Sequence, residues 1–266
     1  MSTTPKPSEW DANAYRQLSD PQFRWGVQVL DTLHLRGDET VLDAGCGAGR
    51  VTAELLERLP RGRVLAVDLS RNMVEQARAL LEPRFGERVH VFERDLLALD
   101  LNEAVEGIFS TAVFHWIGDH DKLFRGLFAA LRPGGWLVAQ CGGGLNLKRL
   151  RQRGRRIMRT PSFAGLFANW SEPWEYASAE KTAERLERAG FVQIKTDLVE
   201  APTTLPDRET YKKFLAAVTM RHHLLYVPDE ALREEFLDRL ADLATKDSPP
   251  FTLDYWRLNM RAAKKS

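Results

Sequence analysis

Val41-Leu42-Asp43-Ala44-Gly45-Cys46-Gly47-Ala48-Gly49 is the stretch from which the fold can be inferred. Its first residues, with Thr40 before them, are short, apolar and β-branched, which is typical of a buried strand. Three glycines follow at alternate positions, and residues 50–59 then have helical character. Strand, glycine turn and helix together form the arrangement that holds a nucleotide-like ligand against exposed backbone. Glycine suits the turn because a Cβ would obstruct both the backbone angles and the approach of a ligand.

The glycine spacing argues against a dinucleotide. Gly45-x-Gly47-x-Gly49 differs from the Gly-x-Gly-x-x-Gly fingerprint, whose third small residue would fall at Arg50. Asp43 would repel a pyrophosphate by about 1 kcal/mol even at water-like screening, and it would attract a cationic group. A nucleoside ligand without phosphate and with a positive amino-acid end fits better, and S-adenosylmethionine is such a ligand. Taken alone, the loop is also compatible with an ordinary tight turn.

An acidic residue follows the second predicted strand, 63–67. This residue is Asp68, about 20 positions beyond the glycine loop, where a carboxylate can accept hydrogen bonds from both ribose hydroxyls. Its alternative role is to cap the next helix, 70–81, although Ser70 can do that as well. The helix carries Met73 on its apolar face, so Met73 is expected in the core, with contact to an adenine as the alternative.

The next two predicted strands also end in polar residues. The strand 89–92 is followed by Asp95, which can accept from an adenine amino group, and by Leu96, whose backbone N–H can meet the ring. A fourth strand, 108–113, leads into Phe114-His115-Trp116. The carboxyl ends of parallel strands lie at one edge of a sheet, and ligands of such sheets bind there. We therefore expect Asp43, Asp68, Asp95 and His115 to lie at one edge.

Four motifs occur in order and carry a resemblance: Asp43-Ala-Gly-Cys-Gly-Ala-Gly49, Val67-Asp68-Leu-Ser-Arg-Asn-Met73, Glu93-Arg-Asp95 and Leu131-Arg-Pro-Gly-Gly-Trp136. They resemble the successive motifs of class I S-adenosylmethionine-dependent methyltransferases, over about residues 10–142 and 178–262. The resemblance implies that the cofactor is S-adenosyl-L-methionine. The residues expected to bind it are Asp43, Gly45, Gly47, Asp68, Leu69, Met73, Asp95 and Leu96.

Finer features resemble the trans-aconitate methyltransferase group: Trp10 with Tyr15, Phe114-His-Trp116 with Asp119-His-Asp121, Thr219-Met-Arg-His-His223 and Leu253-Asp-Tyr-Trp-Arg-Leu-Asn-Met260. This resemblance implies that Tyr15 lies near the sulfonium and that Arg24 pairs with the methionine carboxylate. A solvated surface position is equally open to Arg24. The resemblance also implies that Trp116 and Arg221 bind the substrate, with Arg221 pairing with an acceptor carboxylate.

Strands that alternate with helices predict right-handed crossovers and a parallel sheet. The expected fold is α/β: a Rossmann-like, seven-stranded, mostly parallel sheet with helices on both faces and an inserted helical cap. By resemblance, residues 251–261 form an antiparallel strand between the fifth and sixth. We expect 1–35 to form N-terminal lid helices, and 36–142 with 178–266 to form the cofactor-binding core. Segments 145–176 and 201–250 are expected to be cap insertions over the substrate pocket.

Composition restricts the class of protein. The chain has 266 residues and a formal net charge of +1, which gives no general reason to expect a nucleic acid or an anionic membrane as partner. There are two cysteines and no apolar run near the roughly 20 residues needed to span a bilayer. We therefore expect a cytoplasmic protein with a small-molecule acceptor. The sequence does not indicate an oligomeric state.

The segment 148–159 contains seven basic residues with no acidic residue between them: Lys148, Arg149, Arg151, Arg153, Arg155, Arg156 and Arg159. A solvated helix face is the favoured interpretation, and an anion-binding face for an acidic substrate or a carrier protein is the alternative. The adjacent His222 and His223 have poor spacing for a shared metal and are expected to pack at a helix surface. No metal cluster is visible in the sequence.

These residues together predict a methyltransferase that acts on a small molecule. We expect O-methylation of a carboxylate or hydroxyl by in-line displacement, in which the protein aligns donor and acceptor and excludes water. An ionised carboxylate needs no base, whereas a hydroxyl would benefit from one, and His115 is the candidate catalytic residue. A rim position is the alternative for His115. The other functions considered are methylation of an acyl-carrier-protein-bound carboxylate, a nicotinamide-dependent oxidoreductase, an RNA-modifying protein and a cofactor sensor.

Overall fold

The structure, a computed structural model, describes residues 20–266, which form two compact units. The first contains 20–144, 174–199 and 257–266, and we call it the Rossmann-like unit. The second contains 145–173 and 200–256, and we call it the helical unit. Trp10 and Tyr15 lie outside the described residues.

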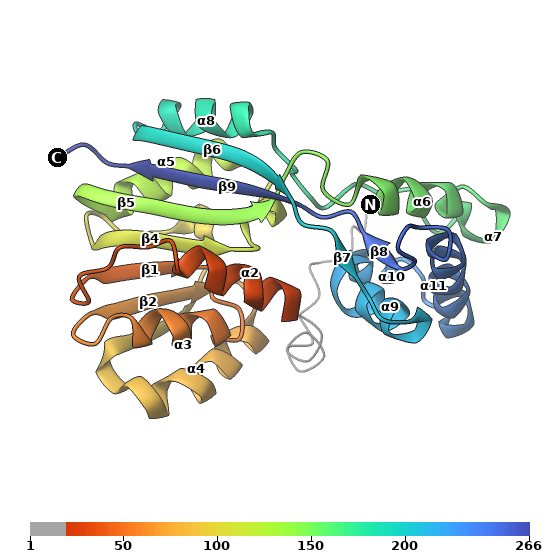
Figure 1. Ribbon diagram of the computed structural model, residues 1–266, viewed down its shortest axis with the longest axis horizontal. Helices are drawn as coiled ribbons and strands as arrows, with labels where there is room; N and C mark the ends of the chain where they lie inside the picture. Colours follow the sequence, from red (N-terminus) through yellow and green to blue (C-terminus); the bar gives the residue numbers. More distant parts are fainter. Residues whose placement is uncertain (1–19) are drawn as a thin grey trace. The chain divides into compact units, whose positions relative to one another are not determined.

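One sheet forms the centre of the Rossmann-like unit, with the strand order β3-β2-β1-β4-β5-β9-β6 (Figure 1). Its strands are β1 (Thr40–Ala44), β2 (Arg63–Asp68), β3 (Val89–Glu93), β4 (Val105–Thr111), β5 (Leu131–Gly142), β6 (Val192–Glu200) and β9 (Trp256–Ala263). Strands β1 to β5 pair in parallel, whereas β9 pairs antiparallel with β5. The predicted seven-stranded, mostly parallel sheet is confirmed, and so is the place of the last strand between the fifth and sixth.

Helices cover both faces of this sheet. The helices α2 (Asp20–Leu30), α3 (Arg50–Glu57) and α4 (Arg71–Phe85) share one cluster of buried apolar side chains with the strands. The helices α5 (His120–Ala130) and α8 (Ala179–Arg188) share a second cluster with the strands. Three short turns complete the unit: η1 (Gly86–Arg88), η2 (Leu96–Ala98) and η3 (Phe114–Trp116). Strands buried on both faces in this way read as continuous apolar runs, which is why the sequence revealed them.

Local sequence signals set where the helices begin and end. The Ser70 hydroxyl accepts a hydrogen bond from the Met73 N–H and starts α4, and Asp119 accepts from the Lys122 N–H and starts α5. The predicted helix 70–81 ends too early, because α4 continues through Pro83 to Phe85. Proline removes one backbone N–H, and Pro83 stands in the last turn, so it does not stop the helix. The helix ends at its C-cap, Gly86.

The helical unit contains α6 (Lys148–Met158), α7 (Pro161–Ala164), α9 (Arg208–Phe214), the π-helix η4 (Leu215–Thr219), α10 (Arg221–Leu224) and α11 (Glu230–Ala244). Two short strands, β7 (Thr203–Thr204) and β8 (Thr252–Leu253), pair antiparallel in a separate sheet. Most of this unit falls in the segments 145–176 and 201–250, whose role as a cap over a substrate pocket remains a prediction. Among residues 20–266, no helix has both the length and the apolar character that a membrane crossing requires.

The expected single strand over 251–261 is wrong in its first half. The chain forms β8, leaves it at Asp254 and Tyr255, and enters the main sheet only at Trp256. The backbone of Asp254 accepts from the Leu147 N–H at 2.9 Å, and its side chain accepts from the Arg149 N–H at 2.8 Å. These hydrogen bonds to the start of α6 replace the sheet pairing that a continuous strand would make.

Candidate cofactor and methyl-transfer site

The glycine loop after β1 has two positions that require glycine for different reasons. Gly45 has φ +93°, and a Cβ built on it would lie 2.1 Å from Cγ2 of Val113. Gly47 has φ +52°, and a Cβ built on it would meet nothing within 4 Å. The loop is therefore packed tightly at Gly45 and open at Gly47. An open backbone position at the end of a parallel strand is suited to the close approach of a ligand.

Asp68 holds the glycine loop at the end of β2. Its Oδ2 accepts a hydrogen bond from the Gly47 N–H at 2.9 Å, and its Oδ1 accepts from the Ser70 N–H at 2.9 Å. The loop is also fixed from behind, because the carbonyl of Val67 accepts from the N–H groups of Gly45 and Cys46. The structure thus brings together Asp68 and Gly47, two residues that were expected to bind the cofactor. The ribose as partner of Asp68 remains a prediction.

Asp43 is buried beneath the same loop and is 2% exposed. Its Oδ2 accepts a hydrogen bond from the Thr52 hydroxyl at 2.7 Å. Burial raises the pKa of Asp43 to about 7, against the opposing effect of the Thr52 hydrogen bond and with a small contribution from Asp68. A cationic group bound nearby would favour the ionised form, which fits the predicted attraction for the ammonium end of the cofactor.

The remaining predicted cofactor residues divide into exposed and buried side chains. Leu69 is 60% exposed at the tip of β2, although it is apolar. Asp95 is exposed, and its Oδ1 accepts from the Leu97 N–H at 2.8 Å. Met73 and Leu96 are buried, which matches the core interpretation of Met73. The side chains of Leu69 and Asp95 are thus open to a ligand, whereas Leu96 could offer its backbone.

Three further residues predicted to bind the cofactor or the substrate lie away from the glycine loop or outside the described residues. Arg24 is exposed on α2, and its pairing with a carboxylate remains a prediction. Tyr15 lies outside the described residues. Arg221 begins α10 in the helical unit. Its neighbour His223 is buried and stacks on Trp170, with 4.2 Å between ring centroids, and burial lowers the pKa of His223 to about 3.

His115 lies in the turn η3, directly beyond β4, and is 8% exposed. Its Nδ1 accepts a hydrogen bond from the Gly142 N–H at the end of β5, at 3.3 Å. Burial is the main cause that lowers the pKa of His115 well below its usual value, followed by the nearby Arg257 and His120. The ring is therefore neutral at pH 7, and because Nδ1 accepts, the proton is on Nε2.

Aromatic rings surround His115 within the Rossmann-like unit. Trp116 lies 5.2 Å from it and Tyr176 5.7 Å, between ring centroids. Trp174 lies 5.8 Å from Trp116 and stacks on Tyr176 with an interplanar angle of 11°. Trp174 and Tyr176 fall in the segment 145–176 expected to be a cap insertion, but both group with the Rossmann-like unit. The only sequence signal was their position just before the Ser178 cap of α8.

The basic run of α6 is neither a fully solvated face nor a row of unpaired cations. Glu172 binds Arg151 and Arg155, and the buried Asp247 binds Arg149 and Arg153. Both nitrogens of the Arg153 fork contact Asp247, at 2.7 and 2.9 Å. The acidic partners come from later in the chain, so the sequence of the run did not reveal them.

Comparison with known proteins agrees with this geometry. Residues 41–135 match a family described as a methyltransferase domain. The trans-aconitate 2-methyltransferase of Azoarcus sp. (strain BH72) is 38% identical over 131 residues, which cover 49% of this chain and 50% of that protein. The trans-aconitate 2-methyltransferase of Methylobacterium radiotolerans is 30% identical over 192 residues, covering 70% of this chain and 67% of that protein. The chain thus matches half to two thirds of these relatives.

A solved structure shows the same fold. Phosphoethanolamine N-methyltransferase 2 of Haemonchus contortus, in complex with S-adenosyl-L-methionine, superposes with a TM-score of 0.63 and 18% identity. The superposition covers 96% of this chain and 57% of that one.

The chain therefore belongs to the class I S-adenosylmethionine-dependent methyltransferases. The family uses S-adenosyl-L-methionine as its cofactor. The matches are to methyltransferases, which favours methyl transfer over the alternative of a nicotinamide-dependent oxidoreductase.

Proposed function

We propose that the protein transfers the methyl group of S-adenosylmethionine to an oxygen of a small carboxylic acid. The observation that carries this proposal is the hydrogen bond that Nδ1 of His115 accepts from the Gly142 N–H. Nδ1 is thus occupied, so the neutral ring offers an N–H at Nε2 and no free lone pair. A donor suits an acceptor that is already an anion, and a carboxylate is ionised at neutral pH.

A hydroxyl acceptor would need a group that removes its proton. In the tautomer fixed by Gly142, Nε2 of His115 already carries a proton and Nδ1 already accepts a hydrogen bond. Neither ring nitrogen is therefore free to accept the proton of a hydroxyl. A carboxylate needs no such step, because one of its oxygens can accept from Nε2 while the other attacks. The similarity to trans-aconitate 2-methyltransferases, whose name refers to an acid, points in the same direction.

The residues of the Rossmann-like unit have separate roles in this proposal. Asp68 and the open backbone at Gly47 bind the nucleoside end of the cofactor, and Asp43 attracts its positive end. His115 and Trp116 orient the acceptor. S-adenosylmethionine, when bound, supplies a methyl group on a good leaving group. The protein then contributes alignment and the exclusion of water.

The experiment is an acceptor screen with purified protein and S-adenosylmethionine, in which each carboxylic acid is paired with its alcohol analogue. Release of S-adenosylhomocysteine and the mass of the product are measured. We expect methyl esters from acids, with trans-aconitate in the panel, and no ethers from the alcohols. Methylation of the alcohols alone would overturn the proposal.

Substitution of His115 separates a donor from a base. Glutamine keeps an N–H donor but cannot accept a proton, so His115→Gln should lower kcat by less than about 10-fold if the group only donates. Loss of a general base would lower kcat by about 10²- to 10⁴-fold. The matched control is His90→Gln, since His90 is an exposed histidine of β3 in the same unit.

A second candidate acceptor is a carboxylate carried by an acyl carrier protein. Lys148, Arg155, Arg156 and Arg159 are exposed, and their spacing puts them on one face of α6 and its end. Such a face suits an acidic protein surface. Exchange of Arg156 and Arg159 for glutamate should then raise the KM for a carrier-bound acid and leave that for the free acid unchanged. Equal effects on both would remove this candidate.

A further inference from the structure

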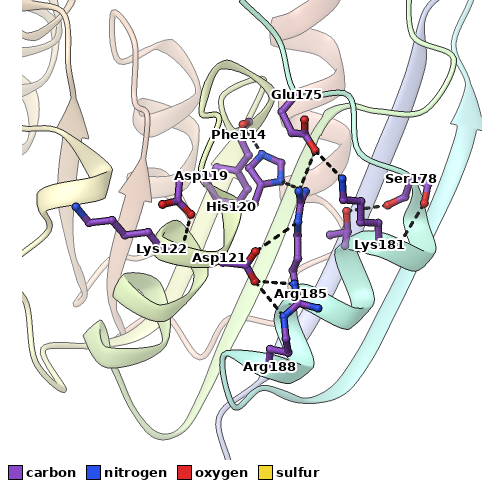
Figure 2. A network of polar contacts seen from close by, with 11 residues as sticks. Phe114, Asp119, His120, Asp121, Lys122, Glu175, Ser178, Lys181, Arg185 and Arg188 are labelled. Atoms are coloured by element: carbon purple, nitrogen blue, oxygen red, sulfur yellow. Dashed lines mark hydrogen bonds and ion pairs between the residues drawn. The ribbon is translucent and has the colours of Figure 1, made fainter.

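A buried histidine outside the proposed site binds the turn that carries His115. His120, the first residue of α5, is 2% exposed. Its Nε2 lies 2.9 Å from the carbonyl oxygen of Phe114, and its Nδ1 lies 3.0 Å from Nη1 of Arg185 (Figure 2). A guanidinium nitrogen can only donate, so Nδ1 accepts and the proton on Nε2 is donated to Phe114. Burial is the largest cause that lowers the pKa of His120, which keeps this ring neutral.

Arg185 extends this contact to a second carbonyl of the same turn. Its Nη2 lies 3.0 Å from Oε1 of Glu175. The backbone N–H of Glu175 in turn donates to the carbonyl of His115 at 2.9 Å. Figure 2 shows Arg185 reaching from α8 to both His120 and Glu175. The guanidinium of Arg185 therefore binds both His120 and Glu175. These two residues donate to the consecutive carbonyls of Phe114 and His115.

Glu175 is also the sequence neighbour of two aromatic residues that contact the turn. It stands between Trp174 and Tyr176 in the sequence, and these rings contact Trp116 and His115 respectively. A shift of Glu175 would move both rings relative to the turn. Arg185 is 8% exposed, so its charge is held by these contacts rather than by solvent.

We propose that Arg185 is a positioning residue for methyl transfer: by binding His120 and Glu175 together, it fixes the His115–Trp116 turn against the Trp174–Tyr176 segment. The inference rests on the proposed function in one respect, namely that His115 and Trp116 orient the acceptor. Arg185 acts through these residues and not by contact with the acceptor. Its loss should therefore affect acceptor binding and alignment while the cofactor site keeps its affinity.

The same helix offers a matched control. Arg188 lies three residues after Arg185 on α8, is exposed, and binds Asp121 at 2.6 Å, whereas Nε of Arg185 lies 4.0 Å from the same carboxylate. Arg185→Gln and Arg188→Gln thus remove the same charge from neighbouring positions. Only the first breaks the contacts to His120 and Glu175. A third variant, Arg185→Lys, keeps the charge but has no fork with which to reach both partners.

The kinetic test uses the acceptor found in the screen, whatever its functional group. We expect Arg185→Gln to raise the acceptor KM at least 10-fold, with the Kd for S-adenosylhomocysteine changed by less than 2-fold. Arg188→Gln should change neither quantity, and Arg185→Lys should give an intermediate KM. An unchanged acceptor KM in a folded Arg185 variant, or an equal rise in the Kd, would overturn the proposal. If Arg185→Gln does not fold, Arg185→Lys decides by the same criteria.

Hydrogen exchange provides a readout that needs no acceptor. In Arg185→Gln we expect faster amide exchange in 113–117 and 174–177, with no change in the loop 45–49. Equal exchange in the Arg185→Gln and Arg188→Gln proteins would overturn the positioning role. Failure of every carboxylic acid in the screen would instead contradict only the proposed function, because the exchange difference does not depend on the acceptor.

Discussion

The carboxylate of Asp68 accepts a hydrogen bond from the backbone N–H of Gly47, with 2.9 Å between Oδ2 and the nitrogen. The end of β2 therefore holds the glycine loop that follows β1. Since Oδ1 accepts from Ser70, one carboxylate joins the loop to the start of α4. Any ligand that binds at this edge of the sheet meets a loop whose shape depends on Asp68.

Asp68→Ala should weaken cofactor binding strongly. The substitution removes the hydrogen bonds that shape the loop together with the predicted bonds to the ribose, each worth about 1.5–3 kcal/mol when one partner is charged. We expect the Kd for S-adenosylhomocysteine, measured by calorimetry, to rise about 100-fold. Glu75→Ala is the control, because Glu75 is an exposed acid that pairs with Arg71 on α4. An unchanged Kd in Asp68→Ala would contradict the ribose assignment.

Gly45 and Gly47 should respond differently to alanine. At Gly45 the new methyl would collide with Val113 in a left-handed backbone conformation, so we expect a loss of about 3 kcal/mol or more in unfolding free energy. At Gly47 the space is open, and only the backbone cost of about 1–2 kcal/mol remains. Gly47→Ala should nevertheless weaken cofactor binding, since the methyl occupies the open space. Denaturant unfolding and calorimetry check both; full affinity in Gly47→Ala would mean that the ligand does not approach there.

Asp43 should make stability depend on pH. Its folded-state pKa of about 7 lies above the ordinary value of 3.8, so between these values the folded protein binds a proton that the unfolded chain has lost. The stability of the wild type relative to Asp43→Asn should therefore fall by up to about 1.4 kcal/mol per pH unit from about pH 4 to pH 7, and then level off. Urea unfolding of both proteins at pH 5, 6, 7 and 8 measures this difference. If the difference in unfolding free energy between the two proteins did not change from pH 5 to pH 8, Asp43 would be ionised in the folded protein over that range.

Arg221 should affect only the acceptor. If its guanidinium pairs with a carboxylate, Arg221→Ala should raise the acceptor KM by about 10- to 100-fold, from the loss of charged hydrogen bonds. The Kd for S-adenosylhomocysteine should stay unchanged. Lys213→Ala, at an exposed cation of α9, controls for the loss of positive charge in the helical unit. A KM equal to that of the wild type would remove Arg221 from the substrate site.

The elements that sequence analysis predicted well are those specified by neighbouring residues. The buried strand β1, the glycines after it and the start of α3 lie within about a dozen positions, so their signals are local. Successive βα units also fix the parallel pairing, because right-handed crossovers leave few alternatives. Because β1 and β2 pair in parallel, Asp68 at the end of β2 lies beside the glycine loop that follows β1.

The pairings between distant segments were not predictable in this way. Arg153 finds its acid in Asp247, 94 positions later, and Tyr176 reaches His115 from a segment that the sequence grouped with the cap. The predicted continuous strand over 251–261 failed for the same reason. The partners that interrupt it, at the start of α6, lie more than a hundred positions away.

The sequence by itself determined the Rossmann-like sheet and the family, because apolar periodicity, glycine spacing and the ordered motifs lie within short stretches. Only the tertiary structure decided that Nδ1 of His115 accepts from Gly142 and that Arg185 joins His120 to Glu175. A tautomer and a bridging guanidinium depend on which donors and acceptors the folded chain brings within about 3 Å, and that distance is set by packing between elements rather than by sequence spacing.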